Sequence, residues 1–210
     1  MSERVIRACA ECEKVMPQVH LPLQSASDRI LDDMQRTYTF ATFLDVVARL
    51  RAAIPGLALS TDIIVGFPGE TEEDFEATAA ALESIRFDSA FLFKYSARPD
   101  TRAWKRDETV DEAGKGRRLT RLIDLQHRIS GEIHDGWIGR EVEVLVEGIA
   151  RRNPGQLYGR TAEFKAAVFT NDGTPAGALR RLRVVGATPM TLFGEPVAER
   201  QAAPALVQLG

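Results

Sequence analysis

A mostly apolar, β-branched run from Ala58 to Phe67 stops abruptly at Pro68 and Gly69. Such a run is typical of a parallel strand buried on both faces, and the Pro-Gly pair makes the chain turn. Thr71 then offers a helix cap, with Asp74 in the capping-box position. This succession predicts an α/β fold, in which ligands bind at the carboxyl ends of strands. The glycines of the turn could equally serve only to form a tight loop.

The alternation of strand and helix continues on both sides of this run. A short strand at His20 leads into a polar turn, where Ser27 or Asp28 is the expected helix cap. Apolar residues from Phe40 to Ile54 recur at helical spacing, and a further strand is expected from Phe87 to Ser96. About three parallel strands are predicted, too few to close a barrel. The first part is therefore expected to be the back half of a barrel with an uncovered strand edge.

A long amphipathic helix is expected from Val110 to about His134. One face is apolar and the other is basic. A charged helix face is more often solvated surface than an RNA contact, and we adopt that interpretation. The basic face includes Lys115, Arg117, Arg118, Arg121 and Arg128.

A second, all-β region is expected after Gly136 and Gly139, which mark the domain boundary. Valines alternate with glutamates from Glu141 to Glu147, the period of a strand with one buried face. With further strands at Lys165–Thr170 and Leu182–Val185, the pattern predicts a small barrel of roughly five strands. The predicted domains are residues 1–139 and 140–198, followed by a flexible tail at 199–210.

The composition is that of an ordinary globular chain, with 44% hydrophobic and 27% charged residues. No apolar run approaches the roughly eighteen residues that a membrane span requires, and the N-terminus does not resemble a signal peptide. Two cysteines cannot form a disulfide framework, which favours a reducing setting. We therefore expect a cytoplasmic protein that neither spans a membrane nor is secreted.

Neither cysteine is expected to bind a metal. Cys9 and Cys12 have the C-x-x-C spacing of a redox dithiol or half a metal site, but no second pair completes a tetrahedral set. A structural role is favoured, with Cys9 on the same side of a helix as Val5 and Ile6. The histidines share no ligand spacing, so no metal site is predicted. They are His20, His127 and His134.

Several of these stretches resemble the radical S-adenosylmethionine (SAM) methylthiotransferases, in register over nearly the whole chain. In the first part they are His20–Leu31, Met34–Thr39, Ser60–Thr71 and Phe91–Thr101. The second part resembles the RNA-binding TRAM barrel of that family. Its stretches Val146–Gly148 and Gln156–Thr161 are most similar to the MiaB-type branch. The resemblance implies a partial radical SAM (β/α) barrel followed by a small all-β TRAM barrel.

The resemblance also implies a reaction on tRNA. MiaB-type enzymes exchange a hydrogen at C2 of N6-isopentenyladenosine, beside the anticodon, for a methylthio group. Sister branches act on threonylcarbamoyladenosine in tRNA or on a ribosomal-protein aspartate. The family uses SAM and two 4Fe-4S clusters, whose ligands are cysteine thiolates.

Neither cluster can be built in the family's way from a chain with two cysteines. The chain is therefore expected to lack an N-terminal portion of the enzyme, to be inactive alone and to hold no catalytic residue. The alternatives are a standalone RNA-binding module without catalysis, or a fragment from the threonylcarbamoyladenosine branch.

Two sets of site residues follow from the resemblance. The residues expected near SAM are Gln24, Ser25, Asp62, Ile64, Gly66 and Phe67. Those expected to bind RNA phosphates are Arg151, Arg152, Arg160 and Lys165. Residues 140–210 carry 9 basic and 7 acidic side chains, against 18 and 23 in residues 1–139, which places RNA contact mainly in the second part.

Some positions near these sites leave their role open or depart from the family pattern. Tyr158 could stack on a base or fill the barrel. Ala26 and Asp100 stand where the family has glycine, and they adopt glycine's backbone angles only at a cost. Phe164 replaces an asparagine, which weakens the expected RNA contact there.

Overall fold

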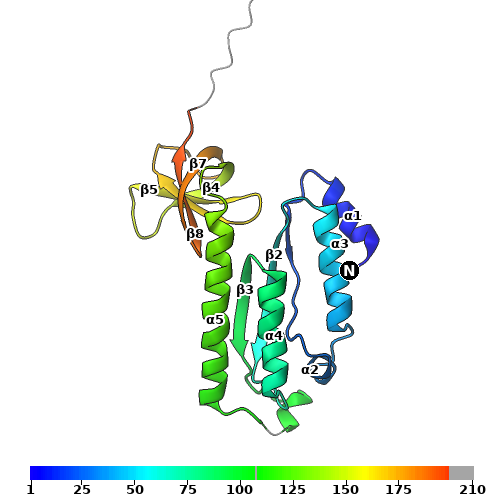
Figure 1. Ribbon diagram of the computed structural model, residues 1–210. Coiled ribbons are helices and arrows are strands. Elements are labelled where there is room, and N and C mark those ends of the chain that lie inside the picture. The colour runs from blue at the N-terminus through cyan, green and yellow to red at the C-terminus, as the bar shows by residue number, and fades with distance from the viewer. Residues whose placement is uncertain (107, 199–210) are drawn as a thin grey trace, which may run out of the picture.

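The computed structural model describes residues 1–106 and 108–198 (Figure 1). A three-stranded parallel sheet of order β1-β2-β3 is followed by a closed five-stranded barrel, and a long helix, α5 (Glu112–Asp135), joins the two modules. The expected part-barrel and small all-β barrel are confirmed, whereas the predicted tail at 199–210 lies outside the described residues. The other elements of the first module are α1 (Glu3–Glu11), β1 (Gln18–His20), α2 (Asp28–Asp33), α3 (Phe40–Ala53), β2 (Ala58–Val65), α4 (Glu72–Ile85), β3 (Ser89–Lys94) and η1 (Ala103–Lys105).

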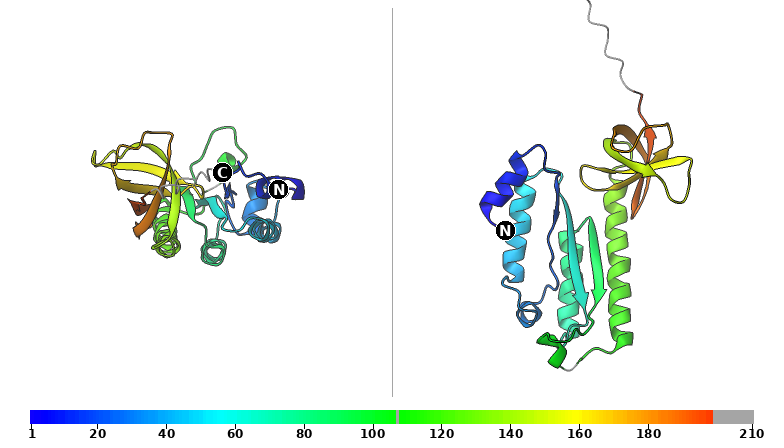
Figure 2. Two further views of the ribbon diagram at one scale, coloured as in Figure 1. Left: turned by 90° about the horizontal axis from the view of Figure 1, so that it is seen from above. Right: turned by 180° about the vertical axis from the view of Figure 1, so that it is seen from behind.

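The sheet is covered by helices on one face. β2 lies at its centre, with Val19 of β1 paired to Leu59. The view from above shows α3, α4 and α5 in a row along the same side of the sheet (Figure 2). On the opposite face Phe91 and Phe93 of β3 are 57% and 50% exposed. The expectation of three parallel strands that do not close a barrel is confirmed.

Side-chain caps begin the helices near the predicted positions. The Asp74 N–H donates to Thr71 Oγ1, and the Thr71 N–H donates to the Asp74 carboxylate at 2.8 Å, which completes the capping box of α4. Of the two candidate caps for α2, Ser27 is the one used. Thr39 forms a further capping box at the start of α3. Polar residues between strands and helices therefore set where these helices start.

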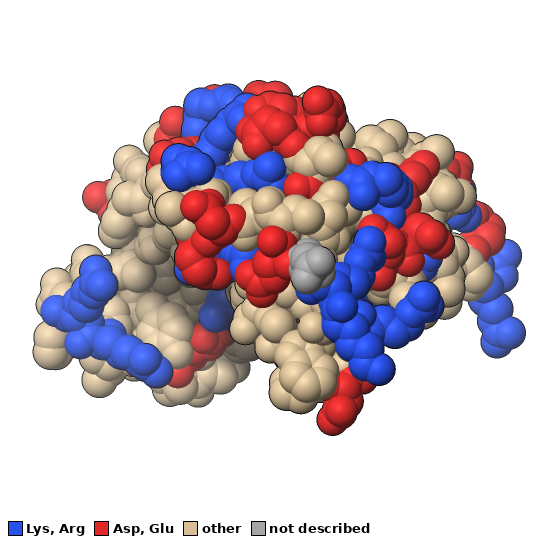
Figure 3. Space-filling model, turned by 90° about the horizontal axis from the view of Figure 1, so that it is seen from below, with Lys and Arg blue, Asp and Glu red and all other residues tan. Residues whose placement is uncertain are grey.

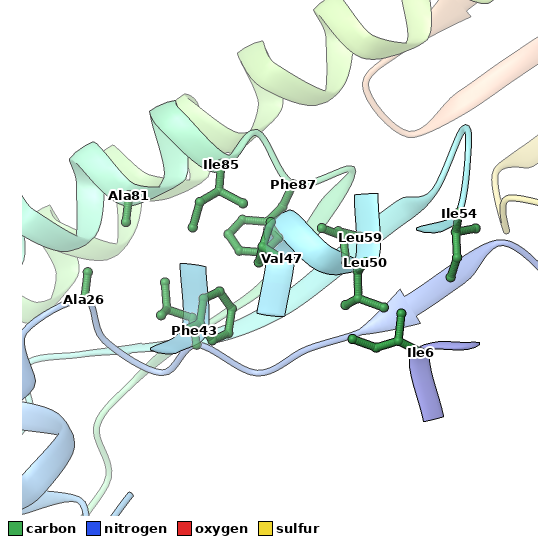
Figure 4. Close-up of a cluster of buried hydrophobic side chains, with 11 residues drawn as sticks. Ile6, Ala26, Phe43, Val47, Leu50, Ile54, Leu59, Ala81, Ile85 and Phe87 are labelled. Atoms are coloured by element: carbon green, nitrogen blue, oxygen red, sulfur yellow. The ribbon is translucent and has the colours of Figure 1, made fainter. Parts of the chain in front are cut away.

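Apolar side chains from both helices and strands meet beneath α3 in one cluster (Figure 4). Phe87 in this cluster has no exposed surface, and burial of such a side chain stabilises the fold by roughly 3 kcal/mol. α1 joins the cluster through Ile6, which is 1% exposed. The sequence placed Val5 on the same side, but Val5 is 46% exposed, because adjacent helical positions point about 100° apart.

Charged side chains line the seam between α4 and α5, which lie side by side (Figure 1). Beneath it Phe75 and Leu122 share an apolar cluster. The predicted solvated face holds for Arg121 and Arg128, but Lys115 is buried. Exposed ion pairs contribute little to stability, so the outer pairs mainly neutralise the basic face of α5, whereas the paired Arg118 and Glu70 side chains are only 11% and 1% exposed. The pairs are Arg118 with Glu70 and Glu72, Arg121 with Glu76, and Arg128 with Glu83.

The second module is a barrel closed in the order β4-β5-β6-β8-β7. Val144 and Val146 point into it while Leu145 between them is 44% exposed, which confirms the predicted alternation. β5 and β8 were not among the predicted strands; β8, whose parallel pairing with β6 helps to close the ring, contains Gly194 and Pro196, which weaken its strand signal. The strands are β4 (Glu141–Ile149), β5 (Gln156–Thr161), β6 (Ala166–Thr170), β7 (Leu179–Thr188) and β8 (Thr191–Pro196).

Candidate cofactor edge and RNA surface

The middle strand of the sheet presents a polar strip on the face opposite the helices. In β2, Ser60, Asp62 and Ile64 alternate with residues turned toward the helices. His20 of β1 contacts two of them, because Nε2 lies 3.3 Å from the Asp62 carboxylate and Nδ1 lies 3.0 Å from Ser60 Oγ. The strip is therefore already hydrogen-bonded within the protein.

Gln24 joins this strip through its backbone. Its N–H donates to the Asp62 carbonyl at 2.8 Å, and its own carbonyl accepts from the Ile64 N–H at 3.0 Å. The φ of Gln24 is 68°, a region that residues other than glycine seldom adopt. Such backbone strain is often found at ligand sites. The structure thus brings together Gln24, Asp62 and Ile64, three of the six predicted cofactor residues.

Gly66 follows β2 at the carboxyl edge of the sheet, and only glycine fits there. Its φ is 73°, and its N–H donates to Glu70 Oε2 at 2.7 Å. A Cβ at this position would overlap Cγ of Lys115 and lie 3.1 Å from its Cδ. Both the backbone angle and the space therefore require glycine. The close approach is made by a side chain of α5.

Two buried charged residues, Lys115 and Glu70, lie beneath this turn. No sequence motif identifies them as buried. Lys115 is 1% exposed, and its Nζ donates to Glu108 at 2.6 Å and to Glu112 at 3.1 Å. Burial alone would lower the pKa of Lys115, but the two carboxylates outweigh it and raise that pKa. Burial raises the pKa of Glu70, although Gly66 and Arg118 act in the opposite direction. On the surface at this end of the molecule, basic and acidic side chains are interspersed (Figure 3).

The remaining two predicted cofactor residues are enclosed by packing. Ser25 has no exposed surface, and its hydroxyl lies 3.4 Å from Thr78 Oγ1 and accepts from the Ser27 N–H at 3.2 Å. Phe67 is 6% exposed and meets Tyr95 edge to face, with ring centres 5.2 Å apart. Neither side chain is open to a ligand and neither backbone joins the strip, so we leave Ser25 and Phe67 out of the cofactor edge. Gln24 is equally buried and is kept for its backbone bonds to β2. That edge is hereafter Gln24, Asp62, Ile64 and Gly66.

The cysteines do not fit an iron–sulfur cluster. Cys9 lies on α1 and packs against the core, and Cys12 is exposed just beyond the helix. Across residues 1–106 and 108–198, no group of three or more His, Cys, Asp or Glu is placed to hold a metal ion. Such a cluster is held by several thiolates. The residues present therefore supply no cluster site.

Three of the four predicted RNA-binding residues lie on the β4–β5 hairpin. Arg151 and Arg152 are exposed in its turn. The Arg160 guanidinium lies 4.2 Å from the ring centre of Phe164, and its Nε donates to a β4 carboxylate at 3.0 Å. Phe164, which stands where the family has asparagine, therefore packs its ring against the Arg160 guanidinium. Tyr158 is half-buried on the same outward side of β5 as Arg160 and does not fill the barrel.

Lys165, the fourth predicted phosphate contact, lies elsewhere. Its side chain is 4% exposed, and its Nζ pairs with Asp88 at 2.6 Å at the junction of the two modules. A buried ammonium group that is already paired is not available to a phosphate in this conformation. The sequence pattern could not show this, because the two residues are 77 positions apart. Lys165 is therefore left out of the candidate RNA surface, hereafter the RNA surface, which comprises Arg151, Arg152 and Arg160.

His134 seals the same junction. Its Nδ1 lies 2.7 Å from the Thr188 carbonyl, and since a carbonyl only accepts, Nδ1 carries the proton. Burial lowers the pKa of His134, and the charge of Lys165 acts in the same direction, against Thr188, Asp88 and Asp135. The imidazole is therefore neutral in the folded protein near neutral pH.

We expect His134 to lower the free energy of unfolding at mildly acidic pH. Below about pH 6.5 the unfolded chain protonates His134 before the folded chain does, so the free energy of unfolding falls as pH drops toward the lower folded-state pKa. Urea unfolding from pH 7.5 to 5 measures this slope. His134→Gln, which keeps a donor for Thr188, should reduce it, whereas His127→Gln on the exposed side of α5 should not. Equal slopes in all three proteins would contradict the assignment.

Comparison with known proteins assigns both modules. Residues 1–82 match the Radical SAM superfamily, and residues 137–197 match the TRAM domain. The chain thus contains a radical SAM match followed by a TRAM match. It is 44% identical over 199 residues to the tRNA-2-methylthio-N(6)-dimethylallyladenosine synthase of Alkaliphilus oremlandii, covering 95% of this chain and 42% of that protein. Proteins of the same name from Chlorobium chlorochromatii and Myxococcus xanthus are 46% and 47% identical over 94% of this chain, or 44% and 43% of their own lengths.

These matches confirm the resemblance to the MiaB-type methylthiotransferases. The chain spans less than half the length of the curated relatives it matches. Within the residues described, no helix is both long and apolar enough to cross a membrane.

Proposed function

We propose that this chain is the C-terminal portion of a tRNA methylthiotransferase that modifies C2 of N6-isopentenyladenosine beside the anticodon. The observation that carries the proposal is the match to proteins named for this reaction along 94–95% of the chain, through both modules in the same order. A tRNA substrate and the unpaired cysteines agree with a cytoplasmic location. The proposal also places the boundary between the two domains after residue 139 and the end of the second domain at residue 198.

The cofactor edge is proposed to hold one side of SAM. The Gln24 and Asp62 backbones are fixed by their mutual hydrogen bond, and Asp62 keeps a partly exposed carboxylate next to His20. Ile64 offers an apolar contact on the same face, and Gly66 ends the strip without a side chain. In the intact enzyme SAM would supply the adenosyl radical and the methyl group. The cluster ligands would come from protein beyond these 210 residues.

Methylthiolation of isopentenyladenosine tRNA tests the proposal. The chain is reconstituted with iron and sulfide under reducing conditions and given SAM, alone and with the N-terminal half of a family enzyme. That half alone is the control, and nucleoside mass spectrometry detects the product. Product only in the combined reaction is the expected result. Product from the chain alone would overturn the claim that it lacks cluster ligands, and neither product nor tRNA binding would overturn the proposed function.

A standalone RNA-binding module is the second candidate, favoured by the absence of a metal-binding group among the described residues. It predicts tRNA binding without product in both reactions. The exposed arginines of the β4–β5 hairpin serve either function, so binding alone does not distinguish the two candidates.

The RNA surface should dominate the electrostatic part of tRNA binding. Replacing both Arg151 and Arg152 with alanine should weaken binding and reduce the slope of log K against log salt by roughly 0.7–0.9 per arginine, because each phosphate contact releases counterions. Fluorescence anisotropy at several salt concentrations measures the slope. Arg128→Ala, which removes an exposed arginine paired with Glu83 on the first module, is the matched control. An equal loss of slope in the control would contradict the assignment.

A further inference from the structure

The two modules touch through a buried ion pair. Lys165 immediately precedes β6 of the barrel, and Asp88 immediately precedes β3 of the sheet. The Nζ–Oδ1 distance is 2.6 Å, and the two side chains are 4% and 20% exposed. This pair therefore connects the two modules and is not an exposed surface ion pair of either one.

Asp88 is held rigidly on the sheet side. Its Oδ2 accepts from the Leu59 N–H at 2.8 Å, and its own N–H donates to the Leu59 carbonyl at 2.8 Å. Its carbonyl accepts from Ser130 Oγ of α5 at 2.9 Å. Ser130 also accepts from Gln126, whose amide donates to the Phe87 carbonyl at 2.8 Å. The carboxylate that meets Lys165 is thus fixed to β2 and α5 together.

Lys165 is held on the barrel side. Its carbonyl accepts from the Thr161 N–H at 3.0 Å, which closes the turn between β5 and β6. Its Nζ also lies 5.4 Å from the ring centre of Trp137, at the end of α5. A charge placed between an aromatic ring and a carboxylate, out of contact with solvent, loses much of its stabilisation when the partner is removed.

The covalent link between the modules is a single helix end. α5 stops at Asp135, and Gly139, with φ of 86°, lies between the helix and β4. One helix followed by a glycine-containing turn leaves rotation about the helix axis open. A second attachment away from that axis removes the rotation. Lys165 and Asp88 supply such an attachment, and the His134–Thr188 hydrogen bond lies beside the helix end.

We propose that Lys165 is a positioning residue, whose pairing with Asp88 fixes the TRAM barrel on the radical SAM sheet. The barrel stands at the amino ends of the strands, and the cofactor edge lies toward their carboxyl ends (Figure 1). An RNA held by the barrel therefore reaches the cofactor edge only along a path whose length the junction sets. This consequence for tRNA rests on the proposed function, whereas the fixed orientation does not.

The distance between two spin labels tests the orientation in the chain itself. One label is placed on native Cys12 in a Cys9→Ala background, and the other on Leu179→Cys, an exposed position at the start of β7. Double electron–electron resonance should give one narrow distance distribution for the parent. Lys165→Met should broaden it at least about twofold, because modules joined by one small contact move relative to each other by default.

Two further variants keep the test decisive. Arg183→Met removes an exposed barrel arginine paired with Glu141 inside the same module, and should leave the distribution narrow. Asp88→Asn acts from the sheet side and should broaden it even if Lys165→Met destabilises the barrel, which circular dichroism would detect. A distribution as narrow in both Asp88→Asn and Lys165→Met as in the control would overturn the proposal.

Binding of isopentenyladenosine tRNA separates this role from a phosphate contact. Lys165→Met should keep affinity within about twofold of the parent and leave the salt slope unchanged, because its ammonium is not presented to RNA. A fall in the slope of roughly 0.7–0.9, the amount expected for one phosphate contact, with an unchanged label distance would instead make Lys165 a phosphate ligand. Absence of tRNA binding by the parent would count against the proposed function while leaving the orientation result intact.

Discussion

Replacing Gly159 with alanine is expected to unfold the TRAM barrel. A Cβ at this position in β5 would overlap the carbonyl oxygen of Leu145 and come within 2.7 Å of Cγ1 of Val144. The obstacle is the backbone of β4, so no side-chain rotation relieves it. We expect a loss of at least about 3 kcal/mol, the upper end of the usual cost of overpacking. Urea unfolding followed by tryptophan fluorescence measures it, in a Trp104→Phe background so that the signal comes from Trp137.

Gly186→Ala is the matched control for this substitution. Gly186 lies in β7 of the same barrel, and the nearest atom to a Cβ there is 3.9 Å away on Phe193, an ordinary van der Waals contact. The control should therefore change stability by less than about 1 kcal/mol. Equal losses in both variants would show that the barrel resists any alanine in a strand, and the close approach at Gly159 would not be the cause.

Local patterns in the sequence were sufficient to predict most of the first module. The capping box at Thr71 and Asp74 and the parallel strand from Ala58 depend on residues within a few positions of one another, and both are found. Periodicity likewise located β4, since one face of that strand must be apolar. β8 was missed because a short strand containing glycine and proline lacks such a pattern.

The site residues were predicted less completely because their roles depend on neighbours far along the chain. At Gly66 the sequence indicates a close approach, but the group that approaches belongs to Lys115, nearly fifty positions later. Ser25 and Lys165 were assigned by resemblance, and each is committed to a long-range partner, Thr78 and Asp88. The spacing of residues along the sequence cannot identify partners that lie so far apart.

Asp74→Ala is expected to destabilise the radical SAM module by about 3 kcal/mol, because one carboxylate holds two elements together. It accepts from Ser27 Oγ at 2.5 Å at the start of α2, and from the Thr71 N–H and hydroxyl at 2.8 and 2.9 Å at the start of α4. Arg29 of α2 also pairs with it. Loss of the carboxylate would leave four donors without this acceptor and remove the capping box of α4.

The pH dependence of stability identifies the carboxylate as the cause. Burial acts to raise the pKa of Asp74, but the bonds from Ser27, Thr71 and Arg29 outweigh it and lower that pKa below its ordinary value. Its contribution is therefore complete above the unfolded-state pKa near 3.9 and is lost as pH falls through the lower folded-state pKa. Glu83→Ala, which removes an exposed carboxylate of α4 that pairs with Arg128 away from the cap, is the control and should leave the free energy of unfolding at pH 7 nearly unchanged. If the parent and Asp74→Ala differ as much at pH 2 as at pH 7, the loss arises from packing, and the link between α2 and α4 does not depend on the ionised carboxylate.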